Sequence, residues 1–320
     1  MNTSKLTGRR FLPNVPNHVY RRSYDSGVVF YSDIDRLIYH SIRSVCVRRA
    51  GAKVYSSCLM FNHTHDLVSC RSIQSFRLCE GSTASIFAKL YNSDKGIRGP
   101  LIDPPFGSAP KRTDKDIRSC ANYIANNASE KKLCLKAVDY RWNYLAFSNG
   151  DHPFSEPFVP NEASQRLRSA IRTMRRKSEE NKYLEYGFVR GLYKKLSEKE
   201  WQQFLDITIK EYLYIDFDAC ARYYGGLQNM LVAPDSNTGN EFDIREDFGS
   251  RSHVPYCRMV SALNAAGYES PLGLPYHELK RLIPLMNHNT GATFKQIALF
   301  LHIPEDMVKT ELFCNSWNGY

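Results

Sequence analysis

The stretch "KVYSSCLMFNHTHDLVS" (residues 53–69) contains two short apolar runs that meet at Phe61-Asn62. Runs of this length bounded by polar residues are typical of strands, and the short break between them is typical of a hairpin. The second run carries His63 and His65, two positions apart. Because successive side chains of a strand point to opposite faces, the two histidines share one face and lie about 7 Å apart along the strand. Two imidazoles at that separation can bind one cation.

The segments around this hairpin predict an ordered set of elements. We expect a strand over residues 17–31 with a break at Ser26-Gly27, a helix over 32–51, a helix over 72–96, a loop or short strand over 96–116 and a helix from about 114 to 128. Strand, helix, strand, strand, helix and a further strand or helix is the order of a ferredoxin-like layer. The predicted fold class is therefore α+β, an antiparallel sheet with helices on one face, followed by a mostly helical C-terminal region.

Composition narrows the classes of function. The formal net charge is +10, which favours a polyanionic partner such as nucleic acid. No apolar run is long enough for a transmembrane helix, so we expect no membrane partner. Nine cysteines without a C-x-x-C pair indicate reduced thiols and a cytoplasmic location. The phosphate-binding and hydrolase glycine motifs are absent from the sequence.

Three regions are predicted from changes in composition. Residues 1–150 hold the strands and the histidine pair, residues 151–256 a helical region with a basic first part, and residues 257–320 a second helical region. Within the last region, residues 291–312 resemble the helix-turn-helix of sigma factors and resolvases, with a break at His302-Ile303-Pro304. In that geometry the second helix enters a DNA major groove.

A third ligand and a nucleophile are available on the helix predicted from about 114 to 128. Tyr123 and Asn127 are four residues apart and share a face of that helix. The amide oxygen of Asn127 could complete a His-His-Asn set with His63 and His65, which suits Mg²⁺ or Mn²⁺, although imidazoles also accept Zn²⁺. "HTHDLV" lacks the closing Asp-His of metallo-β-lactamase-like hydrolases, and the chain does not show the eight β/α units of barrel amidohydrolases.

Several motifs together resemble those of the HUH single-strand transposases with one catalytic tyrosine, which include the REP-associated tyrosine transposases. The similar stretches are Met60–Val68, Phe87–Asn92, Tyr123–Ala128 and Asp139–Tyr144. The resemblance covers residues 14–147, in the family's order and separations. Phe61 and Ala128 replace prolines of the family pattern, and Thr64 replaces a bulky apolar residue.

This resemblance implies a mechanism. His63, His65 and Asn127 would hold a divalent cation beside the scissile phosphate, and Tyr123 would attack the phosphorus to form a 5′-phosphotyrosine. The substrate would be single-stranded or hairpin DNA, and a second copy of the chain is a further expected partner, as a homodimer. One alternative is a catalytically inactive, domesticated relative that regulates transcription as a DNA-binding protein. A more distant alternative is a metal-dependent hydrolase unrelated to nucleic acid.

Overall fold

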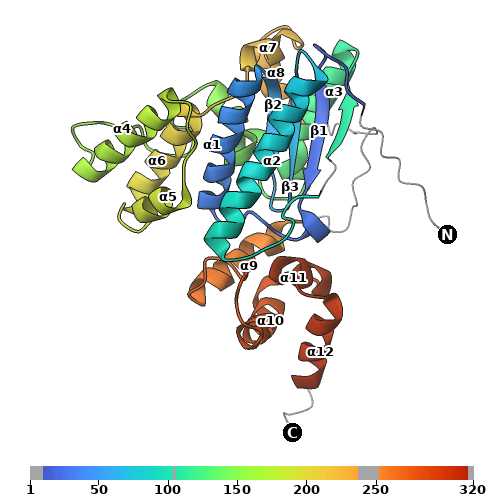
Figure 1. Cartoon of the computed structure of the whole chain (residues 1–320), viewed down its shortest axis with the longest axis vertical. Helices are drawn as coiled ribbons and strands as arrows, with labels where there is room; N and C mark the ends of the chain where they lie inside the picture. The colour runs from blue at the N-terminus through green and yellow to red at the C-terminus, as the bar shows by residue number, and fades with distance from the viewer. Residues whose placement is uncertain (1–9, 104–105, 237–251, 316–320) are drawn as a thin grey trace, which may run out of the picture.

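The computed structural model describes residues 10–103, 106–236 and 252–315 (Figure 1). The strands are β1 (Asn17–Arg22), β2 (Lys53–Leu59), β3 (His63–Ser69) and β4 (Gly107–Pro110). The first three helices are α1 (Asp33–Ala50), α2 (Ile73–Lys95) and α3 (Asp114–Glu130). The remaining helices are α4 (Gln165–Glu179), α5 (Tyr186–Tyr193), α6 (Glu198–Glu211), α7 (Phe217–Arg222), α8 (Leu227–Ser236), α9 (Val254–Ala265), α10 (Tyr276–Thr290), α11 (Phe294–Leu301) and α12 (Glu305–Asn315). Short 3₁₀ turns lie at Tyr24–Ser26, Ala137–Asp139, Arg141–Asn143 and Leu145–Ser148.

The four strands form one antiparallel sheet in the order β2-β3-β1-β4. His65 lies opposite Tyr20 of β1 on one side and opposite Cys58 of β2 on the other. This strand order, with helices crossing over after β1 and after β3, is the ferredoxin-like arrangement. The predicted α+β class is confirmed, including the hairpin at Phe61-Asn62 and the mostly helical C-terminal part.

The helix ends follow from local capping. The Ser32 side chain accepts a hydrogen bond from the backbone N–H of Asp35, whose carboxylate accepts one from the N–H of Ser32. This reciprocal pair satisfies two N–H groups that the first turn of α1 leaves open. At the other end Gly51 has φ 58°, the left-handed conformation that a glycine adopts without strain. Both ends of α1 agree with the prediction.

The strand expected over residues 17–31 is shorter than predicted. β1 ends at Arg22, and a 3₁₀ turn follows at once. The apolar residues after the turn do not join the sheet as a strand. Their backbone N–H groups donate elsewhere: Val29 and Phe30 donate to the Phe61 carbonyl, and Val28 donates to the Leu299 carbonyl of α11. The apolar composition of residues 28–31 correctly indicated that they are buried. They are buried by contacts between distant parts of the chain and not as part of a strand.

The two faces of the sheet are covered by different helices. Helices α1 and α2 pack on the face that carries Val19, Val54 and Val68. Helix α3 packs on the opposite face, against Cys58 and Leu67. The expectation of helices on one face therefore holds for α1 and α2, and α3 forms a further layer. That layer covers the face on which His63 and His65 lie, because they alternate with Thr64 and Asp66.

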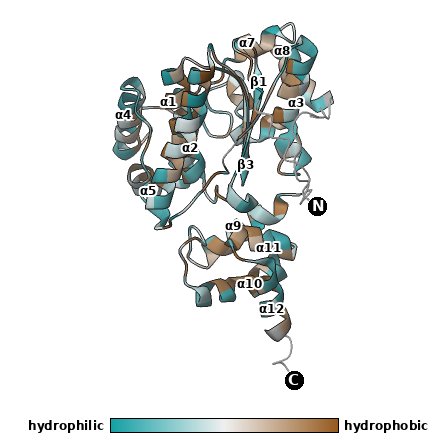
Figure 2. Cartoon of the chain, turned by 45° about the vertical axis from the view of Figure 1, so that its right-hand side comes forward, coloured by the Kyte–Doolittle hydropathy of each residue, from teal (hydrophilic) through white to brown (hydrophobic). Residues whose placement is uncertain are grey.

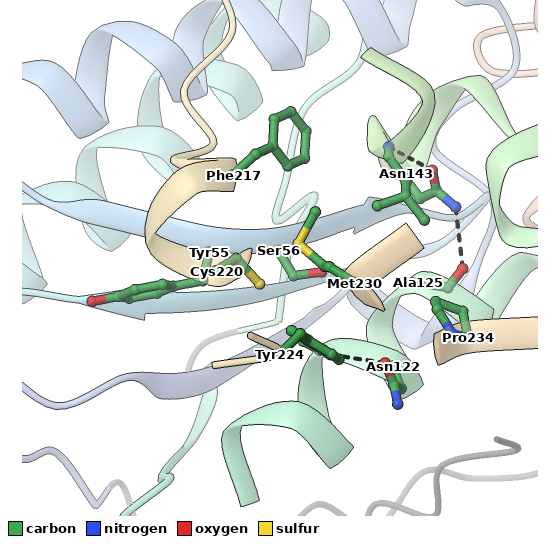
Figure 3. A pocket seen from close by; sticks show the side chains of 12 residues that line it. Tyr55, Ser56, Asn122, Ala125, Asn143, Phe217, Cys220, Tyr224, Met230 and Pro234 are labelled. Carbon is green, nitrogen blue, oxygen red and sulfur yellow. Dashed lines mark hydrogen bonds between the residues drawn. The ribbon is translucent and has the colours of Figure 1, made fainter. Parts of the chain in front are cut away.

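Helices α7 and α8 lie beside α3, with α7 packed against β2 and α8 packed against α3 (Figure 3). A narrow cavity of about 20 Å³ remains between them, next to Asn122, Met230 and Phe217. The Tyr224 hydroxyl donates to Oδ1 of Asn122 at 2.8 Å, and Asn143 donates to the Ala125 carbonyl at 3.1 Å. These bonds fix the position of α3 over the sheet.

A buried ion network lies on the α1–α2 side of β3. Arg43 contacts Glu80 at 2.9 Å and Asp66 at 3.2 Å, and Arg21 contacts both carboxylates as well. All four side chains are almost fully buried. Because each charge in this dry environment has an opposite charge in contact, the network holds β1, β3, α1 and α2 together.

The helices that follow residue 164 form two groups. Helices α4 to α6 share the core of α1, and Figure 1 shows them beside α1, at the flank of the sheet. The outer face of α4 exposes arginines, and Figure 2 draws this helix largely in the hydrophilic colour. The division of the chain at residues 150 and 256 stays a prediction.

Helices α9 to α12 form a second group below the sheet, and their hydrophobic core also includes Val28, Tyr31 and Phe61 (Figures 1 and 2). This group is joined to the body by hydrogen bonds: the Tyr31 hydroxyl donates to the Phe300 carbonyl at 2.6 Å, and His302 Nε2 bonds to the Val28 carbonyl at 2.6 Å. Helices α11 and α12 are joined by a short turn in which His302 has φ 54°. They form the predicted helix pair, and its role in reading DNA stays a prediction. In the described parts of the chain, none of the helices has the length and hydrophobicity needed to span a bilayer.

Candidate metal and nucleophile site

The predicted site residues come together between the sheet and α3. His63 and His65 lie on β3, and their rings are 5.2 Å apart between centroids. Asn127 reaches them from α3, with its Oδ1 3.3 Å from Nε2 of His63. The ring centre of Tyr123, one turn earlier on the same helix, lies 5.4 Å from that of His65, with the two rings nearly perpendicular. The structure therefore brings all four predicted residues into one cluster.

The cluster is buried. His65 is fully buried, and His63, Asn127 and Tyr123 are only 7%, 1% and 9% exposed. Burial lowers the pKa of His63 well below its usual value, and the nearby rings of His65 and His253 lower it further. His63 is therefore a neutral imidazole at neutral pH, which is the form that binds metal ions.

The hydrogen bonds around His63 show which of its two ring nitrogens carries the proton. Asn62 donates its Nδ2–H to the Ser26 carbonyl at 2.7 Å, so its Oδ1 faces His63 Nδ1 at 2.8 Å. Nδ1 must then carry the proton, because Oδ1 can only accept. The lone pair of Nε2 is left facing Asn127. Either the amide nitrogen of Asn127 turns toward Nε2, or a cation lies between Nε2 and Oδ1.

The distances suit a cation. Two ligands about 2.1 Å from Mg²⁺ and at right angles lie about 3 Å apart. The 3.3 Å between Nε2 of His63 and Oδ1 of Asn127 is close to this value. Among the described residues, no group of three or more His, Cys, Asp and Glu side chains is arranged to hold a metal. The candidate set is two imidazoles and one amide oxygen.

Three residues near the cluster were not predicted from the sequence. His18 of β1 places Nε2 3.0 Å from Nδ1 of His65. The Tyr20 ring lies tilted against the same ring, with 4.8 Å between their centres, and its hydroxyl accepts a hydrogen bond from Arg22 at 2.9 Å. Both lie on the histidine-bearing face because they alternate with Val19 and Arg21. Strand alternation could have placed them on one face of β1, but not beside β3.

The third residue, His253, comes from the C-terminal part of the chain. Its ring lies 6.0 Å from that of His63, and its backbone N–H donates to the Lys131 carbonyl at the end of α3. Gln296 of α11 also donates to the neighbouring Ser252 carbonyl at 3.0 Å. No local pattern in the sequence points to this position, since 190 residues separate it from His63 (253 − 63).

Lys131 adds positive charge at the edge of the cluster. Burial lowers the pKa of its ammonium group, while Glu130 beside it raises that pKa in part. A phosphate would be attracted to this partly buried cation.

Comparisons with known proteins are sparse. No protein-family model matches the sequence, and no curated protein matches it. The chain is similar to the solved structure of a REP-associated tyrosine transposase bound to a REP hairpin, with 14% sequence identity and a TM-score of 0.35. That similarity covers 44% of this chain and 81% of the other.

Proposed function

We propose that the chain is a DNA-cutting and rejoining enzyme of the HUH transposase kind, acting on single-stranded or hairpin DNA. The observation that carries this proposal is the meeting of His63 and Asn127 at 3.3 Å, with Tyr123 one helical turn away against His65. The sequence motifs from Met60 to Tyr144 resemble those of that family, and the charge of +10 suits a polyanionic substrate.

His63, His65 and Asn127 would hold a divalent cation, Mg²⁺ or Mn²⁺. When bound, this ion would polarise the scissile phosphate and offset the charge that develops on it. His18 would hold the ring of His65 in place through the contact between its Nε2 and Nδ1 of His65. Lys131 at the edge of the cluster would attract the phosphate.

Tyr123 would supply the nucleophile. Its hydroxyl oxygen forms a bond to the phosphorus, the bond from phosphorus to the 3′ oxygen of the upstream strand breaks, and that oxygen leaves as a 3′-hydroxyl with a proton. The product is a 5′-phosphotyrosine ester. A second 3′-hydroxyl can reverse the step and join strands, because the ester conserves the phosphodiester bond energy.

A second candidate function is DNA binding without cleavage. The observation that favours it is the burial of Tyr123 and His63, with the His253 ring 6.0 Å from that of His63. A scissile phosphate must displace the groups that bury the Tyr123 hydroxyl before it can reach it. In that case the chain would act as a DNA-binding regulator.

One experiment separates the two functions. The protein is incubated with 5′- and 3′-labelled single-stranded DNA in magnesium buffer, and denaturing electrophoresis detects covalent protein–DNA adducts. A nuclease of the proposed kind retains the 3′-labelled fragment, and Tyr123→Phe loses the adduct while it keeps the fold. Tyr20→Phe is the matched control, since Tyr20 lies closer to His65 but on β1. If binding occurs and no adduct forms with any metal, the chain is a binding protein. If the adduct persists in Tyr123→Phe and disappears in Tyr20→Phe, the proposed nucleophile is wrong.

A further inference from the structure

A cavity of about 280 Å³ lies between α1, the β2–β3 turn, residues 140–142 and α9. Its lining includes Tyr31, Arg36, Phe61, Tyr140, Trp142 and Val260. Pockets for drug-sized ligands begin at about this volume, so the space suits a single planar ring system. The cavity exists only because α9 from the C-terminal part packs beside the sheet domain.

The walls combine aromatic rings with one buried cation. The guanidinium carbon of Arg36 lies 4.9 Å from the ring centre of Phe61 and 6.0 Å from that of Trp142. Trp142 is oriented by its indole N–H, which donates to Asp33 at 3.2 Å. Rings held in this way offer flat faces for stacking.

Arg36 is not fully satisfied by the protein. Its side chain is 7% exposed, and its Nε has no hydrogen-bond acceptor among the described residues. The nearest carboxylate is that of Asp33, 3.7 Å from Nη1 and itself partly exposed. A buried N–H without an acceptor is costly, so the site favours a ligand with acceptor atoms.

The cavity lies close to the histidine cluster. Phe61 is two residues before His63 in the β2–β3 turn, and the His253 ring lies 5.9 Å from Phe61 and 6.0 Å from His63. One imidazole therefore separates the cavity from the candidate metal ligands. A single strand with a phosphate at His63 would have a neighbouring base within reach of the cavity.

We infer that this cavity binds one unstacked nucleobase of the DNA strand held at the histidine cluster, and that guanine fits it best. The inference rests on the proposed function and adds a specificity site to it. Phe61 and Trp142 would stack on the base. Arg36 would donate to two neighbouring acceptors, and the O6 and N7 atoms of guanine are the base edge that an arginine fork recognises most often.

The test measures binding in a buffer with EDTA, so that no cleavage occurs. The probes are 12-residue oligothymidines that carry one central guanine, adenine or abasic residue. Loss of one stacked base weakens binding by about 5- to 150-fold. We expect the wild type to bind the guanine probe tighter than the abasic probe by a ratio in this range.

Three variants test whether the preference for a base arises in this cavity. Val260→Phe should fill the cavity from α9 and bring the ratio close to one, whereas Ser261→Phe, on an exposed position of the same helix, should keep it. Arg36→Gln should shift the preference from guanine toward adenine, because glutamine pairs with the N6 and N7 atoms of adenine. Oligonucleotide should also slow alkylation of Cys257 at the rim of the cavity.

The outcomes separate this inference from the proposed function. If the wild type binds the guanine and abasic probes equally, or Val260→Phe keeps the wild-type ratio, the cavity is not a base site and the proposed nuclease still stands. If none of the probes binds, the proposed function falls together with the inference.

Discussion

Nε2 of His63 and Oδ1 of Asn127 lie 3.3 Å apart, although 64 residues separate them in the sequence. His63 is held by β3, and Asn127 by a helix on the outer layer of the sheet. The Nδ1–H of His63 is directed to Asn62, so its Nε2 lone pair points at the amide. In the proposed metal site, this pair would respond most directly to a cation.

Removing one of the proposed metal-binding side chains should abolish DNA cleavage and leave DNA binding nearly unchanged. In His63→Ala, His65→Ala and Asn127→Ala we expect at least a hundredfold loss of single-turnover cleavage in magnesium buffer, with oligonucleotide affinity nearly unchanged, because affinity comes from many phosphate contacts. Titration calorimetry with Mn²⁺ should show no binding to these variants. His277→Ala, on an exposed part of α10, is the control. Wild-type cleavage by His63→Ala would end the metal-site proposal.

His18 should act as a positioning residue for His65. Partners that orient a metal-binding histidine typically contribute 10- to 100-fold in metal affinity. We therefore expect His18→Ala to bind Mn²⁺ about 10- to 100-fold more weakly and to regain cleavage at higher metal concentration, which His65→Ala should not do. Unchanged metal affinity in His18→Ala would show that its contact with His65 is only structural.

Arg43 should be essential for stability. Arg43→Met leaves Asp66 and Glu80 buried with fewer opposite charges, and removal of one partner from a buried ion pair costs about 3–5 kcal/mol. The measurement is the free energy of unfolding in urea. Lys199→Met removes an exposed ion pair with Glu156, and it should leave the midpoint of the urea transition unchanged. A midpoint shift of similar size in both variants would contradict this account of the network.

Acid should destabilise the protein through His40. Burial lowers the pKa of His40 from 6.5 to about 3, although its bond to the Ile209 carbonyl raises it in part. Between pH 6.5 and about 3 the unfolded chain binds a proton there that the folded chain does not. The contribution of neutral His40 to the free energy of unfolding is therefore fully present above pH 6.5, and it decreases as the pH falls below that value.

The corresponding variant is His40→Gln, which should reduce the pH slope of the unfolding free energy by about 1.4 kcal/mol per pH unit in this range. His277→Gln, whose side chain is exposed, serves as the comparison. Equal slopes for the wild type and His40→Gln would mean that another group accounts for the acid sensitivity.

Gly27 and His302 should be energetically coupled. A Cβ atom on Gly27 would overlap the His302 ring, which is fixed by its bond to the Val28 carbonyl. We expect Gly27→Ala to lower the unfolding free energy by about 1–3 kcal/mol, as overpacking usually does. In a His302→Ala background the same substitution should cost much less, and Gly150→Ala, which meets no neighbouring atoms, should be neutral. Additive effects of the two substitutions would contradict the close contact.

Local patterns in the sequence were sufficient for most elements of the sheet domain and for their faces, although the strand predicted over residues 17–31 ends at Arg22. Alternation along 53–69 placed His63 and His65 on one side of a strand, and the four-residue spacing placed Tyr123 and Asn127 on one side of a helix. The capping residue Ser32 and the glycine at 51 marked the ends of α1. Each of these features depends on residues within a few positions of one another, and the periods of 2 and 3.6 residues are set by the backbone itself.

Tertiary structure alone decided which faces meet. Packing of α3 on the histidine-bearing face brought Asn127 to His63, and pairing of β1 with β3 brought His18 to His65. Docking of the C-terminal helices brought His253 beside His63. The same docking closes the aromatic cavity over Arg36. Contacts between residues so far apart in the chain depend on the combined burial of many side chains and on the register of the sheet. A periodic pattern shows that a face will be buried, but it carries no information about the surface that buries it.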